Sequence, residues 1–195
     1  TDTVQVGKKI LQGKQTQKVL AFYKPVGVTC TERDPHAEKK IMDMIRYPER
    51  LTYAGRLDKD SEGLILLTND GDLINAMMRG ANRHEKEYIV KTDREITPDF
   101  LEKMAKGIYL KDLDITTREC EIEQIGKFTF RIVLTQGVNR QIRRMCEACG
   151  YRVKALKRIR IMNVLLGDLK PGKWREVTGE ELEQLQRDTG MLNRN

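Results

Sequence analysis

The chain has 195 residues, of which 39% are hydrophobic and 33% are charged. This balance is typical of a soluble globular protein and excludes a disordered chain, and no apolar run approaches the roughly 20 residues of a membrane-spanning helix. The 36 Lys and Arg exceed the 29 Asp and Glu, for a formal net charge of +7, which favours nucleic acid as the partner before an anionic membrane or a small anionic ligand.

In chain order, residues 3–10 alternate like a short strand and a polar linker follows them. Beyond residue 18, short apolar runs and period-2 patterns predict strands, and 3.6-residue periodicity with caps predicts helices. The predicted strands are 19–23, 51–54, 64–67, 87–92, 113–125, 128–134, 153–161 and 164–166. The predicted helices are 37–46, 72–78, one that opens at Thr97-Pro98, 139–149, and 178–187 with a capping box from Thr178 to Glu181.

These strands and helices alternate irregularly and are joined by connections of hairpin length. Such an order favours an α+β fold with a mainly antiparallel sheet over a doubly wound parallel sheet.

The loop of residues 55–63 lies between two of the predicted strands and holds three carboxylates and two cations. It could bind a metal, perform acid–base chemistry or be a solvated turn. A calcium loop that starts at Asp58 would have Asn69 where a bidentate Glu is required, so we reject an EF-hand. Taken alone, the loop is best interpreted as a charged hairpin connection.

The predicted helix 139–149 has one apolar and one basic face. Its apolar face contains Ile142, Met145, Cys146 and Cys149, and its basic face contains Arg140, Arg143 and Arg144. Eight Lys and Arg stand against Glu147 alone between residues 137 and 160. This pattern could be a solvated face or a stripe that follows a phosphate backbone, and the charge patterning favours nucleic acid.

The four cysteines, Cys30, Cys120, Cys146 and Cys149, have no disulfide-like pattern. We interpret them as reduced thiols in a cytoplasmic protein. Cys146 and Cys149 form a single CxxC without a second pair, and both already lie on an apolar helix face, so core packing is favoured over zinc or redox function.

Five motifs follow one another along the chain. They are KPVG at 24–27, GRLD at 55–58 with SEGL at 61–64, KEY at 86–88, NRQIRRM at 139–145 and GDLKPGKWR at 167–175. Together, over residues 19–185, they resemble the RsuA/RluB/RluE/RluF branch of RNA pseudouridine synthases. The resemblance implies the pseudouridine synthase fold, a bent, mainly antiparallel sheet with flanking helices and a catalytic cleft.

Enzymes of this branch usually carry an N-terminal S4-like RNA-binding domain. By this resemblance we expect residues 1–18 to be the remnant of such a domain with its linker, and residues 19–195 to be the catalytic domain.

The same resemblance implies a reaction without metal or cofactor, in which the C1′–N1 bond of a uridine breaks, the uracil rotates and a C1′–C5 bond forms. Asp58 would be the catalytic carboxylate, which either adds covalently or abstracts a ribose proton. Arg143 would hold Asp58 in its ionised form. Tyr88 would stack on the uracil and help to remove the C5 proton, and the target base would flip out of its stack.

The expected substrate-binding residues are Arg56, Leu57, Arg140, Arg144, Leu156, Lys157 and Arg158. Leu156 would line the base pocket, Arg56 would support the loop or contact RNA, and the basic stripe from 140 to 160 would hold flanking phosphates. We expect a monomer that acts on ribosomal RNA, 23S first, with 16S ribosomal RNA or tRNA as alternatives, and no membrane partner.

Two other classes of function are alternatives to an RNA pseudouridine synthase. A non-catalytic RNA-binding or ribosome-assembly module would also account for the charge. A methyltransferase is disfavoured because no Gly-rich turn for an adenosyl cofactor follows the first strand.

Overall fold

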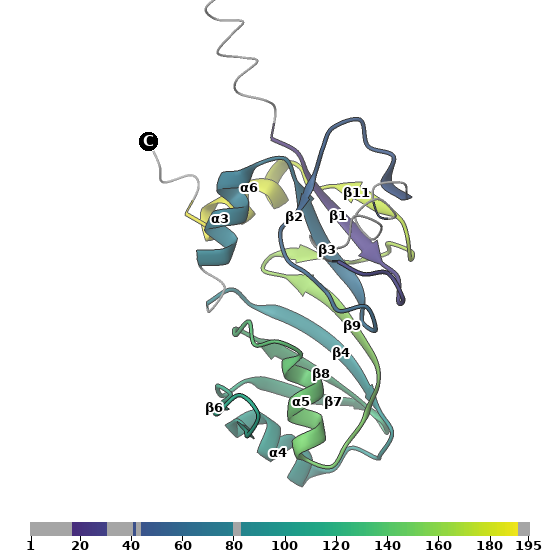
Figure 1. The fold of residues 1–195 in the computed structure, drawn as a ribbon, viewed down its shortest axis with the longest axis vertical. Helices are drawn as coiled ribbons and strands as arrows, with labels where there is room; N and C mark the ends of the chain where they lie inside the picture. Colours follow the sequence, from purple (N-terminus) through teal and green to yellow (C-terminus); the bar gives the residue numbers. More distant parts are fainter. Residues whose placement is uncertain (1–16, 31–40, 42–43, 80–82, 191–195) are drawn as a thin grey trace, which may run out of the picture.

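The computed structural model (Figure 1) describes residues 17–30, 41, 44–79 and 83–190. The strand pattern of residues 3–10, most of the helix predicted over 37–46, and almost all of the expected domain remnant at 1–18 lie outside these described residues. The structure therefore concerns the segment that we expect to be catalytic.

Nine of the described strands form one large mixed sheet. They are β1 (Val19–Lys24), β2 (Thr52–Tyr53), β3 (Glu62–Thr68), β4 (Lys86–Thr92), β7 (Glu121–Gly126), β8 (Thr129–Leu134), β9 (Val153–Ile161), β10 (Val164–Leu165) and β11 (Trp174–Glu176). Their order is β11-β1-β3-β9-β4-β8-β7, with β2 beside β3 and β10 beside β9. Only β3 and β9 are parallel among these pairs. The prediction of a mainly antiparallel α+β fold is confirmed.

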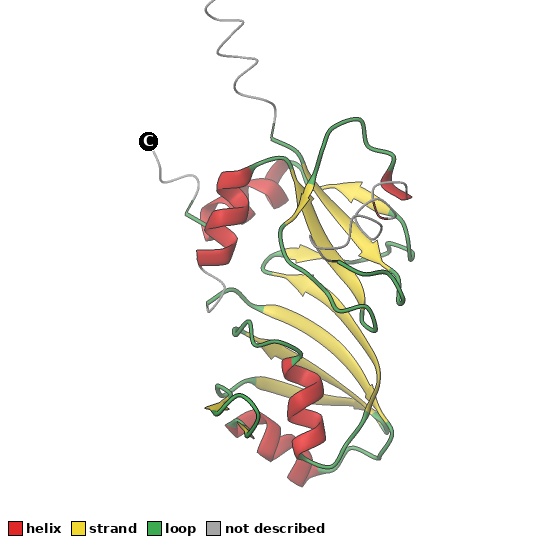
Figure 2. Ribbon diagram, in the orientation of Figure 1, coloured by secondary structure: helices red, strands yellow, loops and turns green. Residues whose placement is uncertain are grey.

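Helices flank the sheet in two places (Figure 2). Beside the upper strands β1 and β3 lie α3 (Gly71–Arg79) and α6 (Gly179–Asp188), and beside the lower strands β4, β8 and β7 lie α4 (Pro98–Lys106) and α5 (Gln141–Ala148). Side-chain caps form at two of them, and the one at Thr97 is as predicted. The Asp70 carboxylate accepts from the amide of Asp72 at 2.9 Å, and Thr97 Oγ1 accepts from the amide of Phe100 at 3.1 Å.

In the upper part of the molecule, β1 and β3 are buried on both faces. Ala21 and Leu64 pack into a cluster with residues of α3 and α6. Phe22 and Ile65, on the opposite face, pack into a second cluster with Leu51. A strand that is covered on both faces needs a continuous apolar run, which explains the unbroken patterns over 19–23 and 64–67.

In the lower part, helices α4 and α5 cover one face of β4 and β8. Phe130 of β8 packs there with Met104 of α4 and Met145 of α5. On the opposite face, Arg131 forms ion pairs with Glu87 at 3.5 Å and Glu123 at 3.0 Å. Alternation of apolar and polar residues is the pattern expected of a half-buried sheet.

Two residue pairs join the upper and lower strands through the β3–β9 ladder, Glu62 with Lys157 and Gly63 with Arg158. Gly63 has φ +118°, and a Cβ at this position would lie 2.3 Å from the Arg158 carbonyl oxygen. Only a glycine permits this approach of the two backbones.

Three details of the sequence prediction were wrong. Residues 113–120 do not extend the hairpin, because β5 (Tyr109–Leu110) pairs with β6 (Ile115–Thr116) in a separate ribbon. The capping box of α6 does not form, since Glu181 instead pairs with Arg175 at 2.6 Å and Thr178 makes no side-chain cap. Strand β11 was missed because three residues carry too little pattern.

Candidate active site

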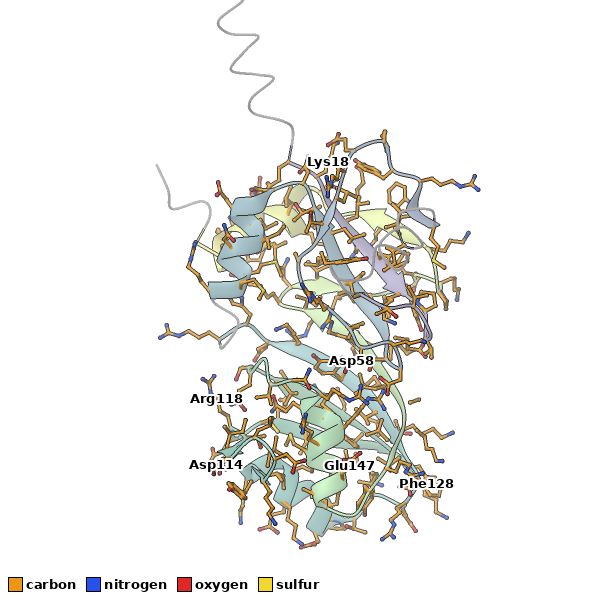
Figure 3. The ribbon with its side chains drawn as sticks, in the orientation of Figure 1. Lys18, Asp58, Asp114, Arg118, Phe128 and Glu147 are labelled. Carbon is orange, nitrogen blue, oxygen red and sulfur yellow. The ribbon has the colours of Figure 1, made fainter. Side chains whose placement is uncertain are left out.

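The loop of residues 55–61 leads from β2 into β3 and so ends at the junction of the upper and lower strands. Leu57 anchors the loop because it is buried in the cluster that contains Phe22 and Ile65. The next side chain, Asp58, is 38% exposed. The Ser61 amide donates to the Asp58 carbonyl at 3.0 Å. In Figure 3, Asp58 accordingly lies at mid-height, with Lys18 above it and Glu147 of α5 below.

Asp58 borders a cavity of about 520 Å³ between this loop, β4 and the start of α5. That volume falls within the usual range of small-ligand sites. Its walls include eight of the residues predicted to act in catalysis or binding: Arg56, Leu57, Asp58, Tyr88, Arg140, Arg143, Leu156 and Arg158. The fold thus brings together residues that lie 100 positions apart in the sequence.

Arg140 is the guanidinium that pairs with Asp58, at 3.3 Å. It also donates two hydrogen bonds to the Asp60 carboxylate, at 3.1 and 2.9 Å. These hydrogen bonds lower the pKa of Asp60 against the opposing effect of burial. Arg140 precedes α5 in the left-handed conformation, with φ 52°, so that the two carboxylates of the loop share one cation.

Arg143 differs from the expectation, which made it the partner of Asp58. Its guanidinium donates to the Asp60 carbonyl at 3.0 Å and to Ser61 Oγ at 3.1 Å, and it lies 3.5 Å from the Asp60 carboxylate. Because Arg143 lies one helical turn beyond Arg140, its side chain contacts the part of the loop that follows Asp58. Its Nε is buried without a hydrogen-bond partner in the described chain.

Tyr88 and Leu156 lie in the cavity wall on neighbouring strands. Tyr88 stands opposite Arg158 on β9, and Leu156, which is buried, stands opposite Val90 of β4. Both side chains contribute to the apolar cluster on the helix-covered face of the sheet. An aromatic ring and an aliphatic side chain in one wall provide an apolar surface for a planar base.

Arg144 and Lys157 are not part of the cavity wall. Arg144 turns back on its own helix start and donates to the Asn139 carbonyl at 2.9 Å, with Asp112 at 3.8 Å. Lys157 lies between Leu156 and Arg158, which face the cavity, so strand alternation directs it to the other face. Neither residue contacts this cavity, and their binding of RNA elsewhere stays a prediction.

The expected basic stripe along β9 does not form a continuous surface. Arg158 is only 2% exposed and donates to the backbone carbonyls of Leu64 at 2.8 Å and Arg56 at 3.1 Å. Arg160 is paired with Glu87 at 2.8 Å and with Glu85 at 3.2 Å. These charges are used within the fold, and Arg158 holds the backbone at both ends of the loop of residues 55–61.

The sequence interpretation missed two contributions to the site. Asp60 was counted only as a loop carboxylate, yet it ties the loop to α5. Lys24, in the KPVG motif, is completely buried and donates to the carbonyls of Pro25 and Val28, both at 2.7 Å. The sequence signal for Lys24 was its position directly after the apolar run 19–23, where a charged side chain at the end of a buried strand needs partners.

The described residues contain no group of three or more His, Cys, Asp and Glu side chains placed to hold a metal ion. Among the helices described, none has the length and apolar character needed to cross a membrane.

Comparison with known proteins connects this geometry to a family. The family described as RNA pseudouridylate synthase matches residues 18–148. The chain belongs to the RNA pseudouridine synthases. Within that family it is 44% identical over 186 residues to a protein of Escherichia coli K12 named dual-specificity RNA pseudouridine synthase RluF, with 94% of this chain and 63% of the relative covered. The chain thus spans less than two thirds of that relative.

Two further comparisons agree. An uncharacterized RNA pseudouridine synthase of Aquifex aeolicus is 34% identical over 190 residues, covering 95% of this chain and 78% of the relative. The crystal structure of a pseudouridylate synthase superposes with a TM-score of 0.79 at 28% identity, covering 88% of this chain and 74% of the other. The expected fold is therefore confirmed.

Proposed function

We propose that this chain isomerises a uridine of RNA to pseudouridine, with Asp58 as the catalytic carboxylate. One observation carries the proposal. Asp58 is partly exposed beside a nucleotide-sized cavity, is ion-paired with Arg140 at 3.3 Å, and shares the cavity wall with Tyr88.

The reaction exchanges one bond to C1′ for another. The C1′–N1 bond breaks with its electron pair on the uracil, the uracil rotates, C5 bonds to C1′, the proton on C5 is lost, and the freed N1 takes up a proton, so that the product is an isomer of the substrate. Asp58 acts as an ionised carboxylate, either by adding to C1′ or by removing a ribose proton. Arg140 places a positive charge within ion-pair distance of this carboxylate.

The other residues position the base and the loop. Tyr88 stacks on the uracil and assists removal of the C5 proton, while Leu156 lines the base pocket. Arg143 is assigned to positioning, since it holds Asp60 and Ser61 directly after Asp58. A uridine within folded RNA must leave its stack to reach this cavity, at a cost of a few kcal/mol.

We propose ribosomal RNA as the substrate, 23S first. The support is the likeness to the Escherichia coli protein and to a Vibrio cholerae protein named ribosomal large subunit pseudouridine synthase B, 33% identical over 177 residues. Because the first relative is named a dual-specificity enzyme, a second RNA is the natural alternative substrate. The chain would act as a cytoplasmic monomer without a cofactor.

The test is release of tritium from C5-tritiated unmodified 23S, 16S and transfer RNA by the wild type and by Asp58→Asn. We expect release from 23S RNA by the wild type and none by the variant. Asp99→Asn is the matched control, because Asp99 is exposed on α4 and pairs only with Lys103 one turn away in the described chain.

Release by Asp58→Asn at the wild-type rate would contradict the assignment of Asp58. Salt-dependent RNA binding by the wild type without release from any RNA would instead support the non-catalytic RNA-binding module. Release from 16S or transfer RNA alone would retain the chemistry and change the substrate.

A further inference from the structure

Lys86 opens β4 and lies in the wall of the cavity, two residues before Tyr88 on the same strand face. Glu87 between them is turned to the other face, where it accepts from Arg160 at 2.8 Å. Leu134 of β8 stands opposite Lys86 and also lines the cavity. The half-buried ammonium group of Lys86 thus belongs to the end of the cavity where Tyr88 provides a ring surface.

Lys24, which is buried, and Lys86, which is half-buried, both lie near the site but in different surroundings. Lys24 donates to two backbone carbonyls and has Asp58 and Asp60 near it, so its positive charge is compensated. For Lys86, the described chain supplies neither a hydrogen-bond acceptor nor a carboxylate partner, and the charge that acts on it is the positive guanidinium of Arg158. Burial together with Arg158 lowers the pKa of Lys86 to about 8.

An uncompensated cation of this kind reduces the stability of the free protein. Groups held in such an environment, within a cavity, are frequently functional. An ammonium group has three donors and no acceptor, so a ligand group that pairs with Lys86 is an acceptor, and one with negative charge binds best.

We propose that Lys86 donates a hydrogen bond to a carbonyl oxygen of the target uracil and stabilises the negative charge that the uracil carries once the C1′–N1 bond is broken. This inference deepens the proposed function and rests on it. It assigns to Lys86 a contact with the substrate, which the motif at 86–88 did not specify.

The chemistry fits either course open to Asp58. When C1′–N1 breaks heterolytically, the electron pair stays with the uracil and is shared by O2 and O4. The half-turn about the N3–C6 axis that replaces N1 with C5 also exchanges O2 with O4. A single donor fixed at one carbonyl position therefore has an acceptor both before and after the rotation, and Lys86 need not transfer a proton.

The position of Lys86 favours the base over a phosphate. Its neighbours in the wall are Tyr88 and Leu134, whereas the exposed Arg56 and the half-exposed Arg140 lie at the loop. A phosphate group remains strongly hydrated and is matched by cations at the solvent side. In the apolar part of the cavity the ammonium group interacts more strongly with a developing charge than it would in water.

Several other titratable groups near Lys86 bear on the pH dependence of the activity. Cys30, Asp58, Lys59, Tyr88 and Arg158 line the same cavity, and His84 precedes the strand. Burial raises the pKa of Cys30 and lowers that of His84. Both shifts move these pKa values further from pH 8, so neither group changes charge close to that pH. Among the groups in the cavity wall whose pKa is shifted, Lys86 is the one that loses its charge as the pH rises through about 8.

The experiment measures kcat/KM for tritium release against pH in wild type, Lys86→Met, Lys86→Arg and the control Lys91→Met, which removes an exposed lysine from the same strand. We expect Lys86→Met to lose about 10²-fold, as for one donor to a developing anion. Wild-type activity should fall as the pH rises through about 8. Lys86→Arg should retain activity within about tenfold and keep it at higher pH, because the guanidinium remains protonated.

Wild-type rates in Lys86→Met, or the same alkaline limb in Lys86→Arg and wild type, would overturn the role of Lys86 while leaving the proposed function intact. An inactive wild type would overturn both proposals. If Lys86→Met fails to fold by circular dichroism, the alkaline limb of Lys86→Arg decides the matter alone.

Discussion

The strands on the two sides of the β3–β9 junction are buried in different ways. β1 and β3 are covered on both faces, and Leu64, Ile65, Leu66 and Leu67 are all completely buried. β4 and β8 are covered on one face and carry ion pairs on the other. Asp58 comes from the doubly covered side, while Tyr88, Lys86 and the arginines of α5 come from the singly covered side. The site exists only where the two sides meet.

This comparison explains why so much of the site consists of ties across the junction. Arg158 of β9 holds the carbonyls of Arg56 and Leu64, and Arg140 and Arg143 hold the carboxylates and backbone that follow. The loop with Asp58 is thus fixed from both sides. Breaking these ties should separate effects on folding from effects on catalysis.

The largest effect is expected from Gly63→Ala. Its Cβ would lie 2.3 Å from the Arg158 carbonyl oxygen at φ +118°, so the two strands must separate. We expect a loss of about 4 kcal/mol or more in the free energy of unfolding, as for the most damaging single substitutions, measured by urea denaturation. Gly71→Ala is the control, since no atom lies within 4 Å of its added Cβ. Equal stability of the two variants would contradict the close junction.

Arg158→Met should destabilise the fold less. It removes hydrogen bonds to the carbonyls of Leu64 and Arg56, and hydrogen bonds from a charged donor contribute about 1.5–3 kcal/mol each. We expect a loss of about 3 kcal/mol by urea denaturation. Lys154→Met, an exposed position on the same strand, should change stability by less than about 0.5 kcal/mol. If Arg158→Met lost as little stability as Lys154→Met, the hydrogen bonds of Arg158 would not stabilise the junction.

Arg140→Met should affect catalysis more than folding. It removes the cation shared by Asp58 and Asp60 from a half-exposed position. We expect kcat/KM for pseudouridine formation to fall about tenfold, or about 1.4 kcal/mol. Arg144→Met is the matched control on the same helix, because Arg144 faces Asn139 and Asp112 instead of the cavity. An equal loss of kcat/KM in Arg140→Met and Arg144→Met would indicate that each arginine only attracts RNA through its positive charge.

The smallest effect concerns pH and Asp60. Its pKa in the folded protein is lowered, so its contribution to stability is present above the unfolded value of about 3.9 and is lost as the pH falls through the folded value. Because the Asp60 side chain is 49% exposed, the stability difference between wild type and Asp60→Asn should stay below about 1 kcal/mol at pH 7. Urea midpoints of the two proteins should converge on acidification, and a constant or widening difference would contradict the ion pair.

The sequence predicted the elements with strong patterns and the residues carried by motifs. The continuous runs at 19–23 and 64–67 became doubly covered strands, and the motifs placed Asp58 and Tyr88 in one cavity. What it could not predict depends on long-range geometry. The left-handed backbone of Arg140 decides which arginine meets Asp58. The backbone carbonyls in reach of Arg158 turn an apparent RNA contact into a buried tie, which charge patterning alone cannot distinguish.

The central claim is that Asp58, among the two carboxylates that Arg140 binds, performs the chemistry. Single-turnover formation of pseudouridine by Asp58→Asn and Asp60→Asn, on the RNA that the wild type uses, tests it most directly. We expect no product from Asp58→Asn and product within about tenfold of the wild-type rate from Asp60→Asn. Product from Asp58→Asn at the wild-type rate, or loss of product only in Asp60→Asn, would contradict it.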